Sequence, residues 1–333
     1  MSKIVVIGCG RWGKNHVRCW AELGCLYGVC DSNAGALASK SQEYGVKAYK
    51  HYLDVVKDPE VDGVVVAVPV ELHHIIASKA LIHGKDVLLE KPMTSTVAEA
   101  TALCGFAKER NRVLLVGHIL EYHPAILKLR EMIRDGAIGD LHEIYSHRLN
   151  SGVVRSFENV WWSFAPHDIL LMLNTVKLCK GVDPTTDPRK LVSEVTSQAS
   201  YYMDRPISDS TLTFFRFANQ VTGHIYVSWM HPYKVQRFVV VGDKGALEFC
   251  LTPEGERLLL HRSVTISGSN VNIKPGVVEN IEFESKEPLK DECIDFLNCM
   301  VTRSRPRSSG DDGLAVIDIL YRAELSAKKG ILS

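Results

Sequence analysis

The sequence has no excess of charge of either sign and no long apolar run. Its 333 residues include 39 Lys and Arg against 39 Asp and Glu. Because a nucleic-acid or anionic-membrane partner usually requires a basic excess, this balance argues against both kinds of partner. No apolar run approaches the roughly 20 residues that a membrane span needs, and the sequence starts without a signal-peptide pattern. We therefore expect a cytoplasmic location.

Paired cysteines and clustered metal-ligating residues are also lacking. The nine cysteines are scattered, and no two of them form a C-x-x-C pair. Several lie within apolar stretches, where cysteine usually acts as a small buried hydrophobe, so we expect neither disulfides nor structural zinc. The histidines are scattered as well, and we expect no metal.

The most informative stretch that is present spans residues 3–31. Residues 4–7 (IVVI) form a short β-branched run that is typical of a buried parallel strand. Gly8, Gly10 and Gly13 follow with the spacing G-x-G-x-x-G, and a helical stretch continues to about residue 23. In a dinucleotide site these glycines permit a tight turn, close approach of the backbone to a pyrophosphate, and close packing of helix on strand. The positive end of the helix then faces the phosphates.

An acidic residue indicates which dinucleotide binds there. Asp31 ends the second apolar run, eighteen positions after Gly13. Its carboxylate can accept hydrogen bonds from both ribose hydroxyls of an adenosine, whereas it would repel a 2′-phosphate. The sequence therefore predicts NAD as the cofactor. Arg11 and Trp12 lie within the glycine-rich turn, and we count them among the cofactor-binding residues.

Strands and helices alternate to about residue 120. The valine-rich run at residues 61–68 and the apolar runs at 87–89 and 113–116 predict strands, with helical stretches between them. This alternation predicts an α/β fold with a doubly wound parallel sheet, in which ligands bind beyond the carboxyl ends of the strands. Pro69, His73, Glu90 and Lys91 follow such strands, and we predict that they line the same crevice as the glycines.

The pattern then changes to long alternating runs, between residues 192 and 251, with turn signals between them. They predict an α+β domain on a large, open, mainly antiparallel sheet. A chain of this length is too long for one ordinary core. We predict an NAD-binding Rossmann domain at residues 1–120 and a substrate-binding and oligomerisation domain at residues 121–333. An open sheet with one apolar face needs a cover, so we expect a homo-oligomer, either a dimer or a tetramer.

Lys91 is the candidate catalytic residue. It directly follows a buried strand, so its ammonium group is expected to emerge into the crevice near the nicotinamide end of a bound dinucleotide. A lysine at that place can hydrogen-bond a substrate hydroxyl or carbonyl. Pro92 follows it and would fix the backbone at this turn.

Four motifs together resemble the glucose–fructose oxidoreductase / inositol dehydrogenase (Gfo/Idh/MocA) family. They are the glycine fingerprint, Val68-Pro69 with His73, Glu90-Lys91-Pro92, and the run VVVGDKG at residues 239–245. The resemblance covers nearly the whole chain. It implies an N-terminal Rossmann domain, a C-terminal domain on a large open sheet, and oxidation or reduction of a sugar carbon by a nicotinamide dinucleotide. It also implies that Lys91 touches the reacting hydroxyl.

The family usually carries the motif D-x-x-x-H at the start of a helix in its second domain. In the matching stretch WSFAPHD, residues 162–168, His167 falls on the histidine, whereas Ser163 stands in place of the aspartate. The resemblance makes His167 the candidate general base. A serine can hydrogen-bond a substrate or the dinucleotide but cannot hold a negative charge beside an imidazole, so the role of Ser163 stays open.

A narrower resemblance concerns the substrate. The segments GHILEYHP (residues 117–124) and SWMHPYK (residues 228–234) are similar to the nucleotide-sugar 3-dehydrogenase branch. Its members oxidise C3 of a UDP-linked N-acetylated sugar, such as UDP-N-acetylglucosamine or its uronic acid, so that an aminotransferase can install nitrogen. Arg148 and Arg155 could then hold a diphosphate. Tyr122 and Trp162 could cover a sugar ring or the uracil.

Two other interpretations remain open. A dehydrogenase for a free sugar or polyol, or a 3-ketoreductase that works in the reverse direction, would use the same residues. A sensor that binds the dinucleotide without turnover belongs to a different class. Such a protein would be expected to lose Lys91 or His167, and this chain keeps both.

Overall fold

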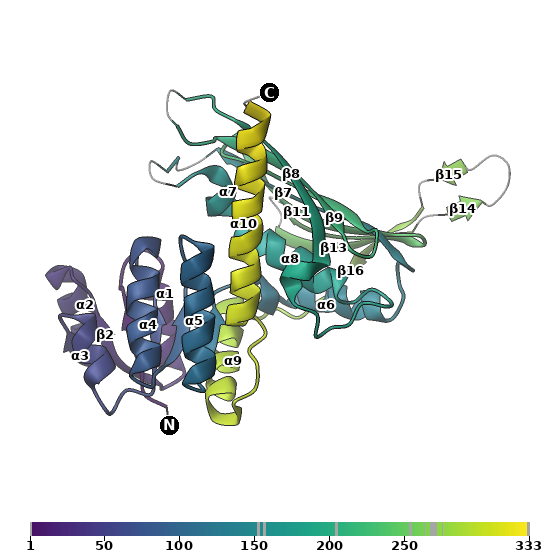
Figure 1. Ribbon diagram of the computed structural model, residues 1–333. Coiled ribbons are helices and arrows are strands. Elements are labelled where there is room, and N and C mark those ends of the chain that lie inside the picture. The colour runs from purple at the N-terminus through teal and green to yellow at the C-terminus, as the bar shows by residue number, and fades with distance from the viewer. Residues whose placement is uncertain are drawn as a thin grey trace. The chain divides into compact units, whose positions relative to one another are not determined.

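The computed structural model describes residues 2–151, 154–155, 158–203, 206–252, 255–262, 264–266, 272–274 and 276–331. The chain forms two compact units, which Figure 1 shows as ribbons. The first unit is Met1–Tyr122 with Glu287–Ile317, and the second is His123–Lys286 with Asp318–Ser333. From the sequence we assigned every residue after 120 to the second domain. In the structure, a segment near the end of the chain belongs to the first unit instead.

The first unit is built on a parallel sheet of six strands. The strands are β1 (Ile4–Ile7), β2 (Leu26–Cys30), β3 (Lys47–Tyr49), β4 (Gly63–Val66), β5 (Asp86–Leu89) and β6 (Leu114–Val116). Their order is β3-β2-β1-β4-β5-β6, and every pair is parallel. This order reverses direction between β1 and β4, the point at which doubly wound sheets bind dinucleotides. The predicted Rossmann fold is confirmed.

Helices link the strands of this sheet. They are α1 (Gly13–Glu22), α2 (Ala34–Tyr44), α3 (Tyr52–Lys57), α4 (His73–Ile82) and α5 (Val97–Glu109), with short 3₁₀ turns η1 (Val70–Leu72) and η2 (Ile119–Tyr122). The central strands are buried on both faces, because helices cover the sheet from both sides. Local sequence sets some helix ends: the Thr96 side chain accepts from the backbone of Glu99, which reciprocates in a capping box.

Helix α9 (Pro288–Thr302) packs against α1 within the first unit. Trp20 on α1 and Phe296 on α9 are both buried, and their rings meet edge to face with centroids 6.1 Å apart. Such pairs bury a large apolar area in a fixed geometry. The contact brings a segment that lies about 270 residues later in the sequence onto the helix that follows the glycine-rich turn.

The second unit is built on an eight-stranded sheet. Its strands are β7 (Leu141–Ser151), β8 (Val192–Ser200), β9 (Ser210–Phe217), β10 (Thr222–Ser228), β11 (Met230–Gly242), β12 (Gly245–Thr252), β13 (Gly255–Arg262) and β16 (Val278–Ile281). The order is β16-β13-β12-β11-β7-β10-β9-β8. Only β7 and β10 pair in parallel among these described strands. The predicted large, mainly antiparallel sheet is therefore confirmed.

Helices pack against this second sheet. They are α6 (Pro124–Arg134), α7 (Val160–Phe164) and α8 (Pro166–Val176), and η3 (Pro188–Leu191) precedes β8. A two-stranded sheet of β14 (Val264–Ile266) and β15 (Asn272–Lys274) is separate from the main sheet. Helix α10 (Gly310–Ile331) begins in the first unit and ends in the second. Within the described part of the chain, the helices are all too short or too polar to cross a membrane.

Candidate active site

The glycine-rich turn between β1 and α1 has the backbone that a dinucleotide requires. Gly8 has a φ of +94°, and a Cβ at this residue would lie 2.4 Å from the carbonyl oxygen of Ala67. A Cβ on Gly13 would lie 1.8 Å from the carbonyl oxygen of Gly8, so only glycine lets α1 start this close to the strand. A Cβ on Gly10 would meet no atom within 4 Å, and this open space leaves room for a pyrophosphate.

Asp31 lies at the carboxyl end of β2 beside this turn. Its Oδ2 accepts a hydrogen bond of 2.6 Å from the backbone N–H of Cys9, and its Oδ1 accepts one of 2.7 Å from that of Asn33. These two bonds fix the carboxylate next to the turn while the side chain remains partly exposed. A fixed anion at this position suits the ribose hydroxyls of NAD and repels a 2′-phosphate. The residues present therefore fit NAD.

Glu90, at the end of β5, organises the site. The indole N–H of Trp12 and the Nε2–H of His16 both donate to its Oε1, the latter over 2.7 Å, and the backbone N–H of Lys91 donates to Oε2 over 3.2 Å. Gly117 gives the carboxylate its space, since a Cβ there would lie 3.0 Å from Oε2. Burial alone would raise the pKa of Glu90, but the hydrogen bonds from His16 and Trp12 outweigh it and hold the pKa below its usual range. Glu90 is therefore an anion that ties the glycine-rich turn and α1 to the strand end that carries Lys91.

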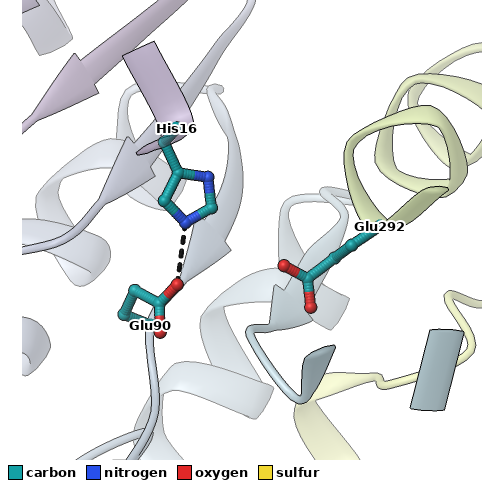
Figure 2. Close-up of side chains that lie close together, drawn as sticks. All are labelled: His16, Glu90 and Glu292. Carbon is teal, nitrogen blue, oxygen red and sulfur yellow. Dashed lines mark hydrogen bonds and ion pairs between the residues drawn. The ribbon is translucent and has the colours of Figure 1, made fainter. Parts of the chain in front are cut away.

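A third side chain, Glu292 on α9, points toward the Glu90–His16 pair (Figure 2). One donor or acceptor atom from each of the three residues lies within 4.8 Å of the others. From the sequence we expected no cluster of metal-ligating residues, because the histidines are scattered. Glu292 lies some 200 positions from Glu90, so their proximity cannot be seen in the sequence. The 2.7 Å separation between His16 and Glu90 is a hydrogen bond, since two ligands of one tetrahedral zinc ion stand about 3.3 Å apart. Within the described residues, His16 and Glu90 are thus hydrogen-bonded to each other, while Glu292 faces the pair without a hydrogen bond to it.

Lys91 lies just after the end of β5, as predicted from the sequence. The peptide bond between Lys91 and Pro92 is cis, and Lys91 is half-buried. His118, which follows β6, is buried near it. Burial and then the positive charge of Lys91 lower the pKa of His118 to about 4. The site therefore pairs a cationic lysine with an imidazole that is neutral at physiological pH.

His73 connects two loops of the site. The residue is buried, and its Nδ1 and Nε2 lie 2.9 Å from the carbonyl oxygens of Pro92 and Val68 respectively. Pro69 follows Val68 directly and precedes η1. Both ring nitrogens face backbone oxygens, so in this structure His73 holds the loops that carry Pro69 and Lys91 together. Direct contact of His73 with a dinucleotide stays a prediction.

In the second unit, His167 lies in the first turn of α8 and is half-buried. Ser163 lies on the preceding helix α7, is 4 % exposed, and donates its backbone N–H to the carbonyl of Asn159 over 3.1 Å. Ala165, the single residue between these helices, keeps a helical backbone with a φ of −72° and a ψ of −22°. Ser163 and His167 therefore lie in one nearly continuous helical segment that is interrupted only at Ala165.

Two predicted phosphate-binding arginines are engaged elsewhere. Arg148 on β7 holds Asp168 in a bidentate ion pair, with Nε–Oδ2 at 2.7 Å and Nη2–Oδ1 at 3.0 Å. Asp168 is only 2 % exposed, so the pair serves to neutralise a buried carboxylate at the start of α8. Arg155 donates to Glu158 over 2.6 Å. The ion pair with Asp168 argues against Arg148 as a diphosphate ligand, because it already engages the Nε and Nη2 of the guanidinium group.

Tyr122 and Trp162, which were predicted to cover a sugar ring or the uracil, lie in different environments. Tyr122 is 1 % exposed in the core of the first unit, and its hydroxyl donates to Asp295 over 2.9 Å. We therefore correct the prediction that Tyr122 covers a substrate: it is a core residue. Trp162 is half-buried and donates its indole N–H to Glu324 over 3.2 Å, which leaves part of the ring exposed.

Sequence reasoning missed two residues of this site. His16 lies one helical turn after Gly13, on the side of α1 that faces the sheet, and its spacing from the fingerprint was a usable signal. Glu292 had no such signal, because nothing local in residues 288–302 indicates that α9 returns to the first unit.

Two family descriptions match the chain. Residues 2–118 match "Oxidoreductase family, NAD-binding Rossmann fold", and residues 126–248 match "GFO/IDH/MocA C-terminal domain". Together the two matches span most of the chain and follow the division seen in the fold.

Known proteins are similar over nearly the full length. The UDP-N-acetylglucosamine 3-dehydrogenase of Acidithiobacillus ferrooxidans is 27% identical over 317 residues, which cover 94% of this chain and 93% of that protein. The scyllo-inositol 2-dehydrogenase (NAD(+)) of Bacillus subtilis is 26% identical over 350 residues, covering 99% and 95%.

Solved structures share the fold. A structure of the same Acidithiobacillus ferrooxidans enzyme superimposes with a TM-score of 0.84 at 23% identity, covering 99% of both chains. A levoglucosan dehydrogenase in complex with NADH and levoglucosan gives a TM-score of 0.82 at 19% identity, covering 98% and 97%. With the glycine-rich turn, Asp31 and the two matched domains, these findings show that the chain belongs to the Gfo/Idh/MocA family and is an NAD-dependent oxidoreductase.

Proposed function

We propose that this enzyme oxidises the C3 hydroxyl of a UDP-linked N-acetylated sugar, UDP-N-acetylglucosamine or its uronic acid, to the 3-keto sugar. The observation that carries the proposal is Lys91 at the end of β5, anchored through its neighbour Glu90 to Trp12 in the dinucleotide turn. The choice of sugar is supported by full-length similarity to a UDP-N-acetylglucosamine 3-dehydrogenase. A 3-keto product is a substrate for transamination, so an aminotransferase is the expected next enzyme.

Lys91 supplies the electrostatic part of the mechanism. Bound NAD supplies an electrophilic ring carbon that takes up the hydride from the sugar. The ammonium group of Lys91 donates a hydrogen bond to the sugar hydroxyl, and this bond strengthens as negative charge develops on the oxygen. The neutral imidazole of His118 adds no competing charge beside Lys91. Interactions that strengthen in the transition state raise kcat rather than binding alone.

His167 is our candidate for the base that accepts the proton of the hydroxyl. A neutral imidazole can take a proton from an oxygen within hydrogen-bond reach. The aspartate that commonly accompanies this histidine is replaced by Ser163, so the second unit must steady the imidazole without a neighbouring charge at that position. The Arg148–Asp168 pair beside His167 fixes the first turn of α8 instead.

A second candidate function is oxidation of a free polyol. The observation in its favour is the bidentate pairing of Arg148 with Asp168, which uses a cation that a diphosphate would need. The full-length similarity to scyllo-inositol 2-dehydrogenase is consistent with it. The same residues would also catalyse reduction of a 3-keto sugar, because they stabilise the same transition state in either direction.

We also propose that the enzyme is a homo-oligomer through the sheet of the second unit. Ile144 and Ser146 on β7 are buried, while the alternating residues Tyr145 and His147 are half-buried. The Tyr145 ring stacks on His224 of β10, with centroids 5.0 Å apart and planes 1° from parallel. This aromatic face is suited to burial against a second copy.

Light scattering on the purified protein should give the mass of a dimer or tetramer, and the mass of a monomer would exclude the arrangement.

Absorbance at 340 nm, which reports reduced nicotinamide, tests the substrate class. Purified protein and NAD should give a signal with UDP-N-acetylglucosamine or its uronic acid, and none with free N-acetylglucosamine, glucose or inositol. A coupled aminotransferase should be present to remove the 3-keto product. A signal with free polyols alone would support the second candidate. NAD binding without turnover of any substrate would instead indicate a sensor.

Lys91→Ala should lower kcat by about 10²–10⁴-fold, the usual contribution of a positioned proton-transfer or charge-stabilising group. The Kd for NAD, measured by calorimetry, should change less than about threefold, because the phosphates and ribose bind to the turn and to Asp31. Lys108→Ala removes an exposed lysine of α5 and serves as the matched control, with unchanged kcat. Loss of NAD binding in Lys91→Ala would show that Lys91 is structural.

A further inference from the structure

Glu292 is a buried carboxyl group for which the mechanism has no use so far. It lies on α9 with no exposed surface, and neither of its oxygens has a hydrogen-bond partner among the described residues. The Nδ1 of His16 is also buried without a partner in the described part of the chain. Figure 2 shows the Glu292 carboxyl group directed at the Glu90–His16 pair. One oxygen of Glu292 lies within 4.8 Å of an atom of each member of that pair, and no hydrogen bond joins Glu292 to either of them.

Only one of the two facing carboxyl groups can be ionised in this environment. Glu90 accepts three donors, from Trp12, His16 and Lys91, and these donors stabilise its charge. Glu292 has no described donor, and an unpaired carboxylate in the interior costs several kcal/mol. The titratable groups that interact with Glu292 among the described residues are mostly acidic or neutral: His16, Glu90, Tyr122, Cys293 and Asp295.

The electrostatics agree with this assignment. Burial first, and then the negative charges of Glu90 and Asp295, raise the pKa of Glu292 well above its usual range. The positive charge of Lys91 acts on Glu90 and helps to lower the pKa of that carboxyl group. The pKa values of the two carboxyl groups are thus shifted in opposite directions, because Glu90 has hydrogen-bond donors and Glu292 has none among the described residues.

We propose that Glu292 is a positioning residue, held as a neutral acid, whose O–H donates a hydrogen bond to one buried water molecule, and that this water donates in turn to the Glu90–His16 pair. The gap of up to 4.8 Å accommodates a single bridging water, which would also satisfy the Nδ1 of His16. This donor adds to those that orient Glu90, and Glu90 orients the backbone of Lys91 and the indole of Trp12. Helix α9 thereby helps to set the geometry of the catalytic lysine. The positioning part of this inference rests on the proposed role of Lys91.

The protonation of Glu292 can be tested without turnover. The infrared spectrum of the purified enzyme at pH 7 should contain the carbonyl stretch of a protonated carboxyl group, which Glu292→Gln should remove. Asp291→Asn, on the same helix but partly exposed, is the matched control and should leave that band intact. A band that is unchanged in Glu292→Gln would overturn the proposal. So would a stoichiometric metal ion, found by mass spectrometry, that is lost in that variant.

The positioning role requires kinetics and binding together. Glu292→Gln keeps a neutral donor, so its kcat should stay within about threefold of wild type. Glu292→Leu removes the donor, and its kcat should fall up to about 100-fold, the cost of a displacement of about 1 Å at a catalytic group. The KM for the sugar should change much less than kcat. A folded Glu292→Leu enzyme with unchanged kcat would show that the residue only fills space.

Stability provides an independent measure of the same proton. Because the pKa of Glu292 is raised in the folded state, wild type is stabilised below the unfolded-state pKa and loses this stability as pH rises toward the folded-state value. Urea unfolding of Glu292→Gln should show a flatter dependence on pH over that range. An identical slope in both proteins would contradict a buried neutral acid. This measurement and the infrared spectrum need no substrate, so they remain decisive even if the proposed sugar is wrong.

Discussion

The carboxylate of Glu90 is the interaction on which the site of the first unit depends. It accepts hydrogen bonds from the glycine-rich turn through Trp12, from helix α1 through His16, and from its own strand end through the backbone of Lys91. A buried anion is tolerated only when such donors surround it. One charge therefore joins the glycine-rich turn to the strand end that carries Lys91, the candidate catalytic residue.

The parallel sheet makes this junction possible. In the order β3-β2-β1-β4-β5-β6 the carboxyl ends of β1, β2, β4 and β5 meet at one edge, so residues far apart in sequence become neighbours. His73 adds a second connection at that edge, between the carbonyls of Val68 and Pro92. The cofactor loop, the η1 turn and the lysine loop thus form one hydrogen-bonded structure, with α9 packed behind α1.

The sequence predicted those features that depend on local chemistry. The spacing of Gly8, Gly10 and Gly13 follows from backbone geometry, and strand alternation follows from hydrophobic periodicity, so both could be recognised from residue types alone. The partner that a given side chain contacts in the folded protein could not be recognised in this way. Arg148 was assigned to a diphosphate because a diphosphate needs fixed cations, and nothing in the sequence shows that Asp168 is buried against it. Tyr122 was assigned to a substrate, although its hydroxyl is bonded to Asp295 in a core completed by α9. The environments of both side chains are set by tertiary contacts, which residue types alone do not show.

The fate of the C3 hydrogen tests the central claim most directly. UDP-N-acetylglucosamine carrying deuterium at C3 should be incubated with the enzyme and NAD, and the reduced cofactor examined by mass spectrometry and NMR. We predict that the deuterium is transferred to the reduced nicotinamide ring, with a slower single-turnover rate than for the unlabelled sugar. Reduced cofactor that contains no deuterium would mean that another carbon is oxidised and would contradict the assignment of C3.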